Sequence, residues 1–311
     1  MSFLEKSMIQ VVIFSFDRAM QLDLLLQSIK KFDSQGLFSL NVLFVCSSEK
    51  YQTAYNRLKS KYPNINWVQE QRYEKKQINF QFELGYWHNL YWWLKSPIFR
   101  ENKSNFKSCL LKILSNNKYP YTMFLTDDSL FYDVINAPAN LEKIRQQPKK
   151  YSFSFRHGIN LHGGIFKEQA NNVCWNVYEN NVYTDWGYPF SVDGLIYDSR
   201  TIYGIIKKIL LNNPNTMEGN IACYVTEKKI FPVISAFKQS CLVGFELNRV
   251  QSVSDNNHLG ISNEKLNEYY LEGYMLEIDF DLTKVNFFRP EIQSVFVKKG
   301  NDKIEIWNSN C

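Results

Sequence analysis

The sequence predicts an α/β fold built on a mostly parallel, doubly wound sheet. Short apolar runs of strand type alternate with stretches of helical periodicity over the first half of the chain. This alternation is typical of βαβ units, which build parallel sheets with helices on both faces. A substantial core is available, because 45% of the 311 residues are hydrophobic and only 22% are charged.

The strands of the first half are predicted from short runs rich in β-branched and aromatic residues. They comprise residues 10–16 (QVVIFSF), 40–46 (LNVLFVC), 65–69 and 121–126 (YTMFLT). A first helix is predicted from apolar residues that recur at positions 22, 25, 26 and 29. Further helices are predicted over residues 51–61, 80–94 and 106–114. Asp17 is a predicted cap of the first helix, because its carboxylate can accept from free backbone N–H groups.

The second half is less regular. A strand is predicted at residues 151–156, and loops with short strands over residues 171–190. Isoleucines at 202, 205, 206 and 209 predict a helix, a short helix follows Pro214, and Ser262 caps a helix over residues 262–272. Residues 231–245 contain two apolar runs. No repeat or linker divides the chain, so residues 1–311 are predicted to form one domain.

Charge and cysteine content narrow the function classes. The net charge of +5 fits phosphate-bearing ligands or an anionic membrane surface, and the absence of a long basic block argues against nucleic-acid binding. Six cysteines without CxxC spacing argue against a zinc ribbon and fit a reducing compartment. Glu5 and Lys6 directly follow Phe3 and Leu4, so we expect no signal-peptide core, and no apolar stretch is long enough to span a bilayer. We expect a cytoplasmic protein whose membrane contact, if any, is peripheral at the inner face.

The strongest local signal is a pair of acidic residues at a predicted strand end. Asp127 and Asp128 directly follow the apolar run 121–126. Two adjacent like charges are costly unless a cation or a solvated cleft stabilises them. A divalent ion that also bridges a donor diphosphate would do so. A turn or a helix cap is the alternative, since Asp favours both.

Several blocks in chain order resemble GT-A glycosyltransferases, which are nucleotide-diphospho-sugar transferases, and in particular bacterial enzymes of cell-surface polysaccharide, lipopolysaccharide and capsule synthesis. The blocks are residues 11–29 (VVIFSFDRAMQLDLLLQSI), 121–131 (YTMFLTDDSLF), 186–196 (WGYPFSVDGLI), 213–218 (NPNTME), 248–260 (NRVQSVSDNNHLG) and 266–273 (LNEYYLEG).

The resemblance implies a GT-A, Rossmann-like fold in which residues 1–135 bind a nucleotide-sugar donor and residues 136–311 form an elaborated acceptor half. It implies transfer of a sugar from a nucleotide-diphosphate sugar to a carbohydrate or glycolipid acceptor. A noncatalytic carbohydrate-binding protein is one alternative, which the aromatic content would serve. A sugar nucleotidyltransferase is another, although such enzymes grip a triphosphate with a Gly-rich loop and residues 15–21 contain no glycine.

The resemblance also assigns residues to a donor site and its metal, Mn²⁺ or Mg²⁺. Asp128 is the expected metal ligand, and Asp127 is expected to contact the ribose or to support the ligand from behind. The usual motif is Asp-x-Asp, and Thr126 or Ser129 occupies one acidic place here. His258 is expected to complete the metal site or bind the diphosphate, with an ordinary loop histidine as its alternative.

Residues beyond the first predicted strand are expected to contact the donor: Ser15, Phe16, Asp17 and Arg18. These residues lie where ligands bind in open α/β sheets, outside the carboxyl ends of the strands. Arg18 is a candidate partner of the diphosphate, because its planar guanidinium suits phosphate oxygens. An ordinary surface arginine is the alternative.

Two carboxylates compete for the role of general base, which an inverting transferase needs to deprotonate the acceptor hydroxyl. Glu218, near the start of the helix after Pro214, matches the base position in the resemblance, although a carboxylate there could instead only favour the helix dipole. Asp193 is the competitor, and is expected to bind the donor sugar or the acceptor if Glu218 is the base. Trp186 and Tyr188 are expected to form a stacking wall for the acceptor ring.

Overall fold

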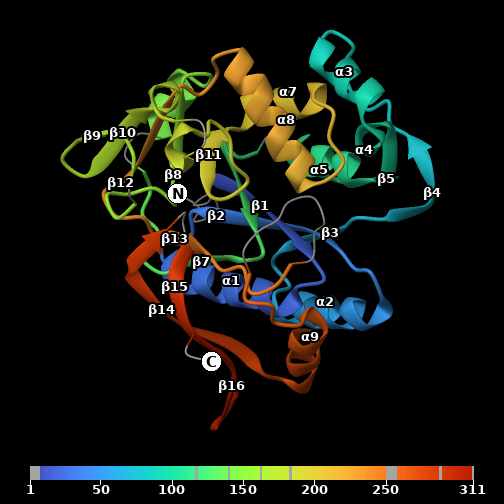
Figure 1. The fold of residues 1–311 in the computed structure, drawn as a ribbon, viewed down its shortest axis with the longest axis vertical. Helices are drawn as coiled ribbons and strands as arrows, with labels where there is room; N and C mark the ends of the chain where they lie inside the picture. Colours follow the sequence, from blue (N-terminus) through green and yellow to red (C-terminus); the bar gives the residue numbers. More distant parts are fainter. Residues whose placement is uncertain are drawn as a thin grey trace, which may run out of the picture.

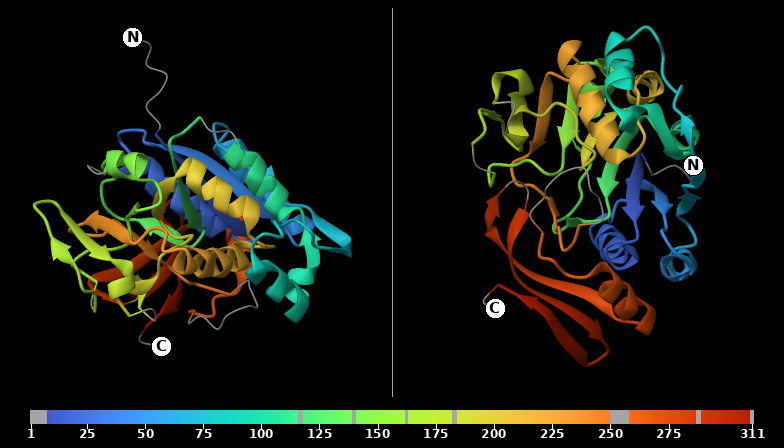
Figure 2. Two further views of the ribbon diagram at one scale, coloured as in Figure 1. Left: turned by 90° about the horizontal axis from the view of Figure 1, so that it is seen from above. Right: turned by 45° about the vertical axis from the view of Figure 1, so that its right-hand side comes forward.

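A computed structural model describes residues 8–115, 118–138, 141–161, 163–181, 184–249, 258–286 and 289–309. It confirms the predicted α/β class. A nine-stranded sheet with strand order β3-β2-β1-β6-β11-β8-β12-β10-β9 forms the centre of the molecule, with helices on both sides (Figures 1 and 2). Two short ribbons and a three-stranded C-terminal sheet accompany it.

The strands are β1 (Ile9–Phe16), β2 (Phe38–Val45), β3 (Asn66–Gln69), β4 (Arg72–Ile78), β5 (Glu101–Ser104), β6 (Tyr121–Thr126), β7 (Ser129–Phe131), β8 (Tyr151–Ser154), β9 (Lys167–Glu168), β10 (Asn172–Asn176), β11 (Leu195–Asp198), β12 (Val233–Phe237), β13 (Leu242–Gly244), β14 (Met275–Asn286), β15 (Arg289–Lys299) and β16 (Asp302–Asn308). The helices are α1 (Ala19–Phe32), α2 (Glu49–Lys61), α3 (Trp87–Lys95), α4 (Pro97–Arg100), α5 (Phe106–Ser115), α6 (Leu141–Gln146), α7 (Ser199–Lys208), α8 (Pro214–Glu227) and α9 (Asn263–Glu272), with 3₁₀ turns η1 (Val177–Glu179) and η2 (Asp185–Gly187).

Alternation along β1 explains why helices cover both faces of the sheet. Ile9, Val11 and Ile13 point into one core shared with α1 and α2. Val12 and Phe14 point into a second core shared with α5, α7 and α8. Because successive side chains of a strand face opposite sides, a strand that is apolar throughout must be buried on both faces.

The order of the central strands decides which residues meet. β1 pairs in parallel with β2 and β6, and β2 with β3, so these four strands end at one edge. β11 runs antiparallel between β6 and β8, with Ile196 opposite Met123. The residues that precede β11 therefore lie beside the last residues of β6.

Most predicted elements are present, and the differences have physical reasons. The helix predicted over residues 80–94 begins only at Trp87, because residues 79–86 form a loop in which Asn79 accepts from the Gln81 amide. The helix after Pro214 is longer than predicted and runs to Glu227. Its cap Asn213 and the N3 residue Thr216 bond each other's backbone N–H groups in a capping box.

The C-terminal sheet β14–β16 lies outside the sequence prediction, which assigns no element to residues 275–308. It packs against the α1 side of the molecule (Figure 1), where Leu276, Val295 and Val297 join the core that contains α1 and α2. In the described part of the chain, no helix is long and apolar enough to cross a bilayer.

We expect Leu25→Ala to lower the free energy of unfolding by about 2–5 kcal/mol, since it removes a fully buried α1 side chain and leaves a cavity. Leu84→Ala removes the same atoms from a side chain that is 74% exposed. Its cost should stay within about 0.5 kcal/mol. Urea unfolding of both variants measures the difference, and equal costs would contradict the assignment of α1 to the core.

Candidate functional site

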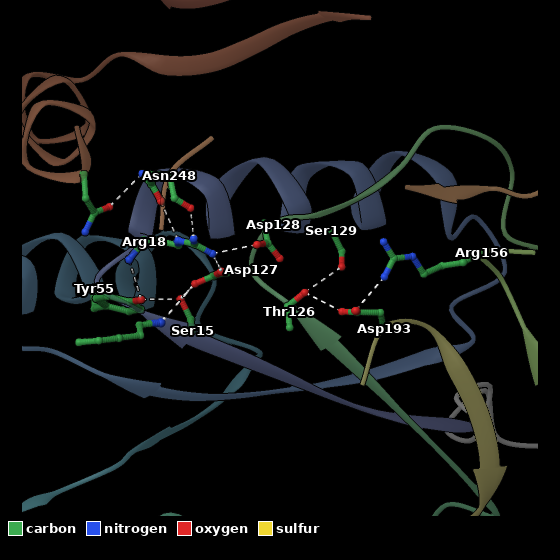
Figure 3. A network of polar contacts seen from close by, with 12 residues as sticks. Ser15, Arg18, Tyr55, Thr126, Asp127, Asp128, Ser129, Arg156, Asp193 and Asn248 are labelled. Carbon is green, nitrogen blue, oxygen red and sulfur yellow. Dashed lines mark hydrogen bonds and ion pairs between the residues drawn. The ribbon is translucent and has the colours of Figure 1, made fainter. Parts of the chain in front are cut away.

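The ends of β1 and β6 and the turn before β11 meet at the carboxyl edge of the sheet (Figure 3). The backbone holds them together beyond the regular strand pairing: the Asp127 amide donates to Phe14 O at 3.1 Å, and the Gly194 amide donates to Phe124 O at 2.8 Å. Asp127, Asp128 and Asp193 are brought to one place in this way, as the predicted strand ends require.

Arg18 bridges the two consecutive aspartates. Its Nη1 lies 3.1 Å from Asp127 Oδ1 and 2.9 Å from Asp128 Oδ2 (Figure 3). The Arg18 side chain is only 9% exposed and that of Asp127 is 5%, whereas Asp128 is 19% exposed. The alternative of a surface arginine is therefore wrong, and Asp128 is the carboxylate of the pair that faces solvent most.

A series of hydrogen bonds from β1 and α2 holds Asp127 in place. Ser15 Oγ donates to Asp127 Oδ2 at 2.7 Å, and the Phe16 amide donates to the same oxygen at 3.2 Å. The Tyr55 hydroxyl, from α2, bonds Ser15 Oγ and accepts from the Arg18 amide at 3.2 Å. Both oxygens of Asp127 thus have protein donors and its side chain is only 5% exposed, so the carboxylate holds Arg18 in place.

Burial and charge oppose each other in this cluster. Burial raises the pKa of Asp127 to about 6, against the lowering effect of the Arg18 guanidinium. Burial also lowers the pKa of Arg18, but the two aspartates outweigh it and the net shift is upward. Arg18 therefore stays charged and acts as the counter-ion of the buried Asp127 carboxylate, whose pKa it lowers against the effect of burial.

Asn248 anchors Arg18 from the loop after β13. Arg18 Nε donates to Asn248 Oδ1 at 2.8 Å, and Arg18 Nη2 donates to the Asn248 carbonyl (Figure 3). These contacts join residues 230 positions apart in the sequence. The guanidinium plane is thereby held from two sides, by the aspartates and by Asn248.

Asp17 has a different role from the predicted cap. Its backbone is left-handed, with φ of 56°, and its carboxylate accepts from the Ser47 amide at 2.8 Å. The N-cap of α1 is Arg18, whose side chain makes no capping bond. Asp17 therefore ties the end of β1 to the end of β2, because it reaches sideways along the sheet edge rather than toward the helix.

A second charged cluster lies beside the first. Asp193 accepts from Thr126 Oγ1 at 2.7 Å through Oδ1, and its Oδ2 lies 2.8 Å from Arg156 Nη1 (Figure 3). Arg156 follows β8, whose carboxyl end reaches the same edge. Each aspartate cluster thus has its own arginine.

Gly194 makes the turn that presents Asp193. Its φ of 83° lies in the left-handed region, which L side chains rarely adopt. A Cβ there would lie 2.2 Å from Leu242 Cδ2. The close approach at this glycine is therefore to the core side chain of Leu242.

Glu218 lies on α8 next to the segment that carries Asp193. Its Oε1 accepts from the Val192 amide at 3.0 Å. Burial, and then the negative charge of Asp193, raise the pKa of Glu218 to about 7. The first turn of α8 contains no acidic residue, so the helix-dipole alternative does not explain Glu218. A carboxyl that titrates near neutrality is suited to acid–base chemistry.

Of the two aromatic residues predicted to form an acceptor wall, Trp186 is placed in the core. It is 1% exposed and packs against Trp175, His157 and Phe166. A Cβ on Gly164 would lie 2.2 Å from its ring. The prediction for Trp186 is therefore wrong, because the ring is buried among other aromatic side chains. Tyr188 is half-buried, and burial followed by the charges of Glu218 and Asp193 raises its pKa.

His258 is exposed, and its Nδ1 accepts from the Gly260 amide at 3.0 Å. Residues 250–257, which precede it in the resembling block, lie outside the described residues. Within the described ranges, no three His, Cys, Asp or Glu side chains are grouped closely enough to hold a metal ion. The roles predicted for His258 as a metal or diphosphate ligand stay predictions.

The sequence analysis assigned no individual role to three residues of the site. Tyr55 and Arg156 carried no motif, and Asn248 stood inside a resembling block without an assigned role. A signal existed for Arg156, since it is the last residue of the strand predicted at residues 151–156. Tyr55 gave none, because a tyrosine in a helix is most often a core residue.

This geometry defines a class of site: charged side chains at the carboxyl edge of a doubly wound sheet, where open α/β proteins bind ligands. No protein-family model matches the chain. Among curated proteins it is similar to the bifunctional glycosyltransferase pgtA of Dictyostelium discoideum, with 24% identity over 321 residues. That match covers 88% of this chain but only 38% of the relative's length. It confirms the resemblance to glycosyltransferases.

Solved structures overlap the chain more loosely. TarS of S. aureus, residues 1–349, is 13% identical with a TM-score of 0.40, over 75% of this chain and 59% of that one. The same fragment of TarS in complex with UDP is 14% identical, with the same TM-score and coverage.

We expect Arg18→Ala to cost about 3–5 kcal/mol of unfolding free energy, because it leaves Asp127 buried without a counter-ion. Adding Asp127→Asn removes that buried charge, and the double variant should recover part of the loss. Urea unfolding of the wild type, both single variants and the double variant at pH 8 closes the cycle. Strictly additive costs would show that Arg18 does not act through Asp127.

Proposed function

We propose that the protein is a glycosyltransferase that moves a sugar from a nucleotide-diphosphate sugar to a carbohydrate or glycolipid acceptor, in the synthesis of a bacterial surface polysaccharide such as lipopolysaccharide or capsule. One observation carries the proposal: the Arg18–Asp127–Asp128 cluster and the Asp193–Glu218 pair lie side by side at the carboxyl edge of the sheet. The similarity to pgtA supports it, although this chain spans about two-fifths of that protein.

The donor binds at the first cluster in this proposal. Asp128 is the more exposed carboxylate, while Asp127, which accepts from Ser15, holds Arg18 in place. Phe16, at the end of β1, is half-buried, and the Arg72 guanidinium lies 4.5 Å from its ring centre. An aromatic ring and an arginine at a strand end offer stacking to a base and charge to a diphosphate.

A divalent cation, Mg²⁺ or Mn²⁺, is proposed as a partner of the donor diphosphate at Asp128. The donor set fits such an ion in one respect: Mg²⁺ takes one or two carboxylates and fills its shell with phosphate oxygens and water. Asp128 supplies one partly exposed carboxylate, and Asp127 is already occupied by Arg18, Ser15 and the Phe16 amide. The cation would neutralise charge that develops on the leaving diphosphate.

Glu218 is the proposed base. In an inverting transfer it removes the proton of the acceptor hydroxyl while that oxygen attacks the anomeric carbon and the nucleoside diphosphate leaves. Its raised pKa makes the carboxylate a stronger proton acceptor than an ordinary glutamate. Asp193 lies between Thr126 and Arg156, where it can bind a sugar hydroxyl. Burial and the charges of both carboxylates raise the pKa of Tyr188.

We place the enzyme in the cytoplasm, in peripheral contact with the inner face of the membrane. A screen of nucleotide sugars, scored by release of nucleoside diphosphate with and without carbohydrate and glycolipid acceptors, tests the proposed activity. Acceptor-dependent release from one donor supports it. Sugar binding without nucleotide release from any donor would favour a noncatalytic carbohydrate-binding protein.

Glu218→Gln keeps the shape of the side chain and removes its ability to accept a proton. Transfer should fall by roughly 10²–10⁴-fold, while donor affinity should stay nearly unchanged. Wild-type transfer should rise as the pH passes through about 7, where Glu218 loses its proton. Transfer assays over pH 5.5–8.5 with parallel donor titrations measure both effects.

Asp193→Asn is the matched comparison. It removes a negative neighbour of Glu218, so the rising limb of the pH profile should move to lower pH, and donor binding should weaken. If Asp193→Asn retains donor binding but abolishes transfer while Glu218→Gln remains active, the two roles are reversed.

Metal dependence is tested by Asp128→Asn together with chelation. EDTA should suppress wild-type transfer, and added Mn²⁺ or Mg²⁺ should restore it. Asp128→Asn should need higher metal concentrations and should lose most activity, with little change in unfolding free energy because the side chain is partly exposed. Full wild-type activity in EDTA would remove the cation from the proposal and leave Arg18 as the positive charge of the site.

A further inference from the structure

An unusual apolar surface lies on the segment that runs from the start of β4 to the end of β5. We name residues 72–104 the α3 arm, after its longest helix. Six large apolar side chains of this segment are between 52% and 79% exposed: Ile78, Phe80, Leu84, Trp87, Tyr91 and Leu94. Three of the chain's seven tryptophans lie within α3. Large exposed apolar patches on soluble proteins mark interaction sites.

Three of these exposed residues form one face of α3. Trp87, Tyr91 and Leu94 have the i, i+4, i+7 spacing of a single helical stripe. Asn89 lies on the opposite face and is the buried residue of the helix. The helix therefore has a polar residue toward the protein and an apolar stripe toward solvent, the reverse of an ordinary surface helix.

Polar contacts hold the arm in this orientation. Asn89 Nδ2 donates to Lys208 O at 2.8 Å, and the Leu210 amide donates to Asn89 Oδ1 at 2.9 Å. Lys107, at the base of the arm, is buried, and its Nζ donates to Ile209 O at 2.7 Å. Because buried polar groups cost free energy unless paired, these bonds specify which face of α3 points outward.

The charge of the arm fits an anionic partner. Residues 72–104 contain six basic and three acidic side chains, in a protein whose whole net charge is +5. Lys95 directly follows Leu94 and lies one helical turn after Tyr91, so it borders the exposed face. Trp and Tyr beside Lys or Arg are the residues that bind the boundary between lipid headgroups and acyl chains.

The arm stands at the same edge of the sheet as the candidate site. It begins just after β3, whose carboxyl end lies at that edge, and Arg72 at its base lies over the Phe16 ring. Figures 1 and 2 show α3 projecting at the periphery of the molecule, clear of the central sheet. A surface bound to α3 would therefore lie near the strand ends rather than behind the sheet.

We propose that the α3 arm docks the protein on an anionic lipid bilayer, with Trp87, Tyr91 and Leu94 inserted at the headgroup boundary and Lys95 against the lipid phosphates. Docking itself is independent of catalysis. The further inference, that docking brings the strand edge close to a lipid-borne acceptor, rests on the proposed function.

Cosedimentation with vesicles tests the docking, and it requires neither donor nor acceptor. The probes are vesicles of phosphatidylcholine alone and of phosphatidylcholine with phosphatidylglycerol. The wild type should bind the anionic vesicles at low salt, and should bind the neutral vesicles and the high-salt mixture more weakly. The triple variant Trp87→Ser, Tyr91→Ser, Leu94→Ser should lose about tenfold or more in partition to anionic vesicles.

Two further variants keep the test decisive. Ile159→Ser, Ile165→Ser, Met275→Ser removes three exposed apolar side chains outside the arm, and its vesicle binding should equal that of the wild type. Lys95→Glu keeps the stripe and should weaken binding only to the anionic vesicles. Thermal unfolding verifies that each variant is folded.

Unchanged vesicle binding by a folded arm variant would overturn the proposal. A wild type that binds no vesicles but elutes as a dimer in size-exclusion chromatography would also overturn it, provided that the arm variant elutes as a monomer. The stripe would then contact a second copy of the chain. An enzyme that fails to transfer sugar but binds vesicles through α3 would contradict the proposed function alone.

Discussion

The candidate site depends on the pairing of one buried arginine with two consecutive carboxylates. Asp127 is buried at the end of an apolar strand, where an isolated charge would cost several kcal/mol. Arg18 compensates that charge, and Ser15, Tyr55 and Asn248 fix the guanidinium and the carboxylate in one arrangement. Preorganisation of this kind matters for catalysis, because oriented charges need not rearrange when a charged substrate binds or reacts.

Sheet topology supplies the second half of the site. Because β11 runs antiparallel between β6 and β8, Asp193 precedes a strand and still reaches the edge at which β1 and β6 end. Thr126 and Arg156 then hold it beside Glu218, whose pKa is raised first by burial and then by this neighbour. Two carboxylates in different environments can divide the work of binding and of proton transfer between them.

The sequence was informative where one local pattern decides the structure. The apolar runs of β1 and β6 are buried on both faces, so they predicted the strands, and the polar residues after them predicted the site edge. Contacts between distant residues were not predictable: Asn248 meets Arg18 across 230 positions. Trp186 and Tyr188 are neighbours of similar chemistry, and only packing against Gly164 and Trp175 shows that Trp186 belongs to the core. The exposed stripe of α3 has the same periodicity as a buried one, so sequence alone could not orient it.

A structure of the protein crystallised with a nucleoside diphosphate and Mn²⁺ tests the central claim most directly. We expect the diphosphate beside Asp128 and Arg18 at the ends of β1 and β6, with Asp127 still held by Ser15 and the nucleobase near Phe16. A nucleotide bound elsewhere on the chain, or one that binds the wild type and an Asp128→Asn, Arg18→Ala double variant equally well, would contradict the account.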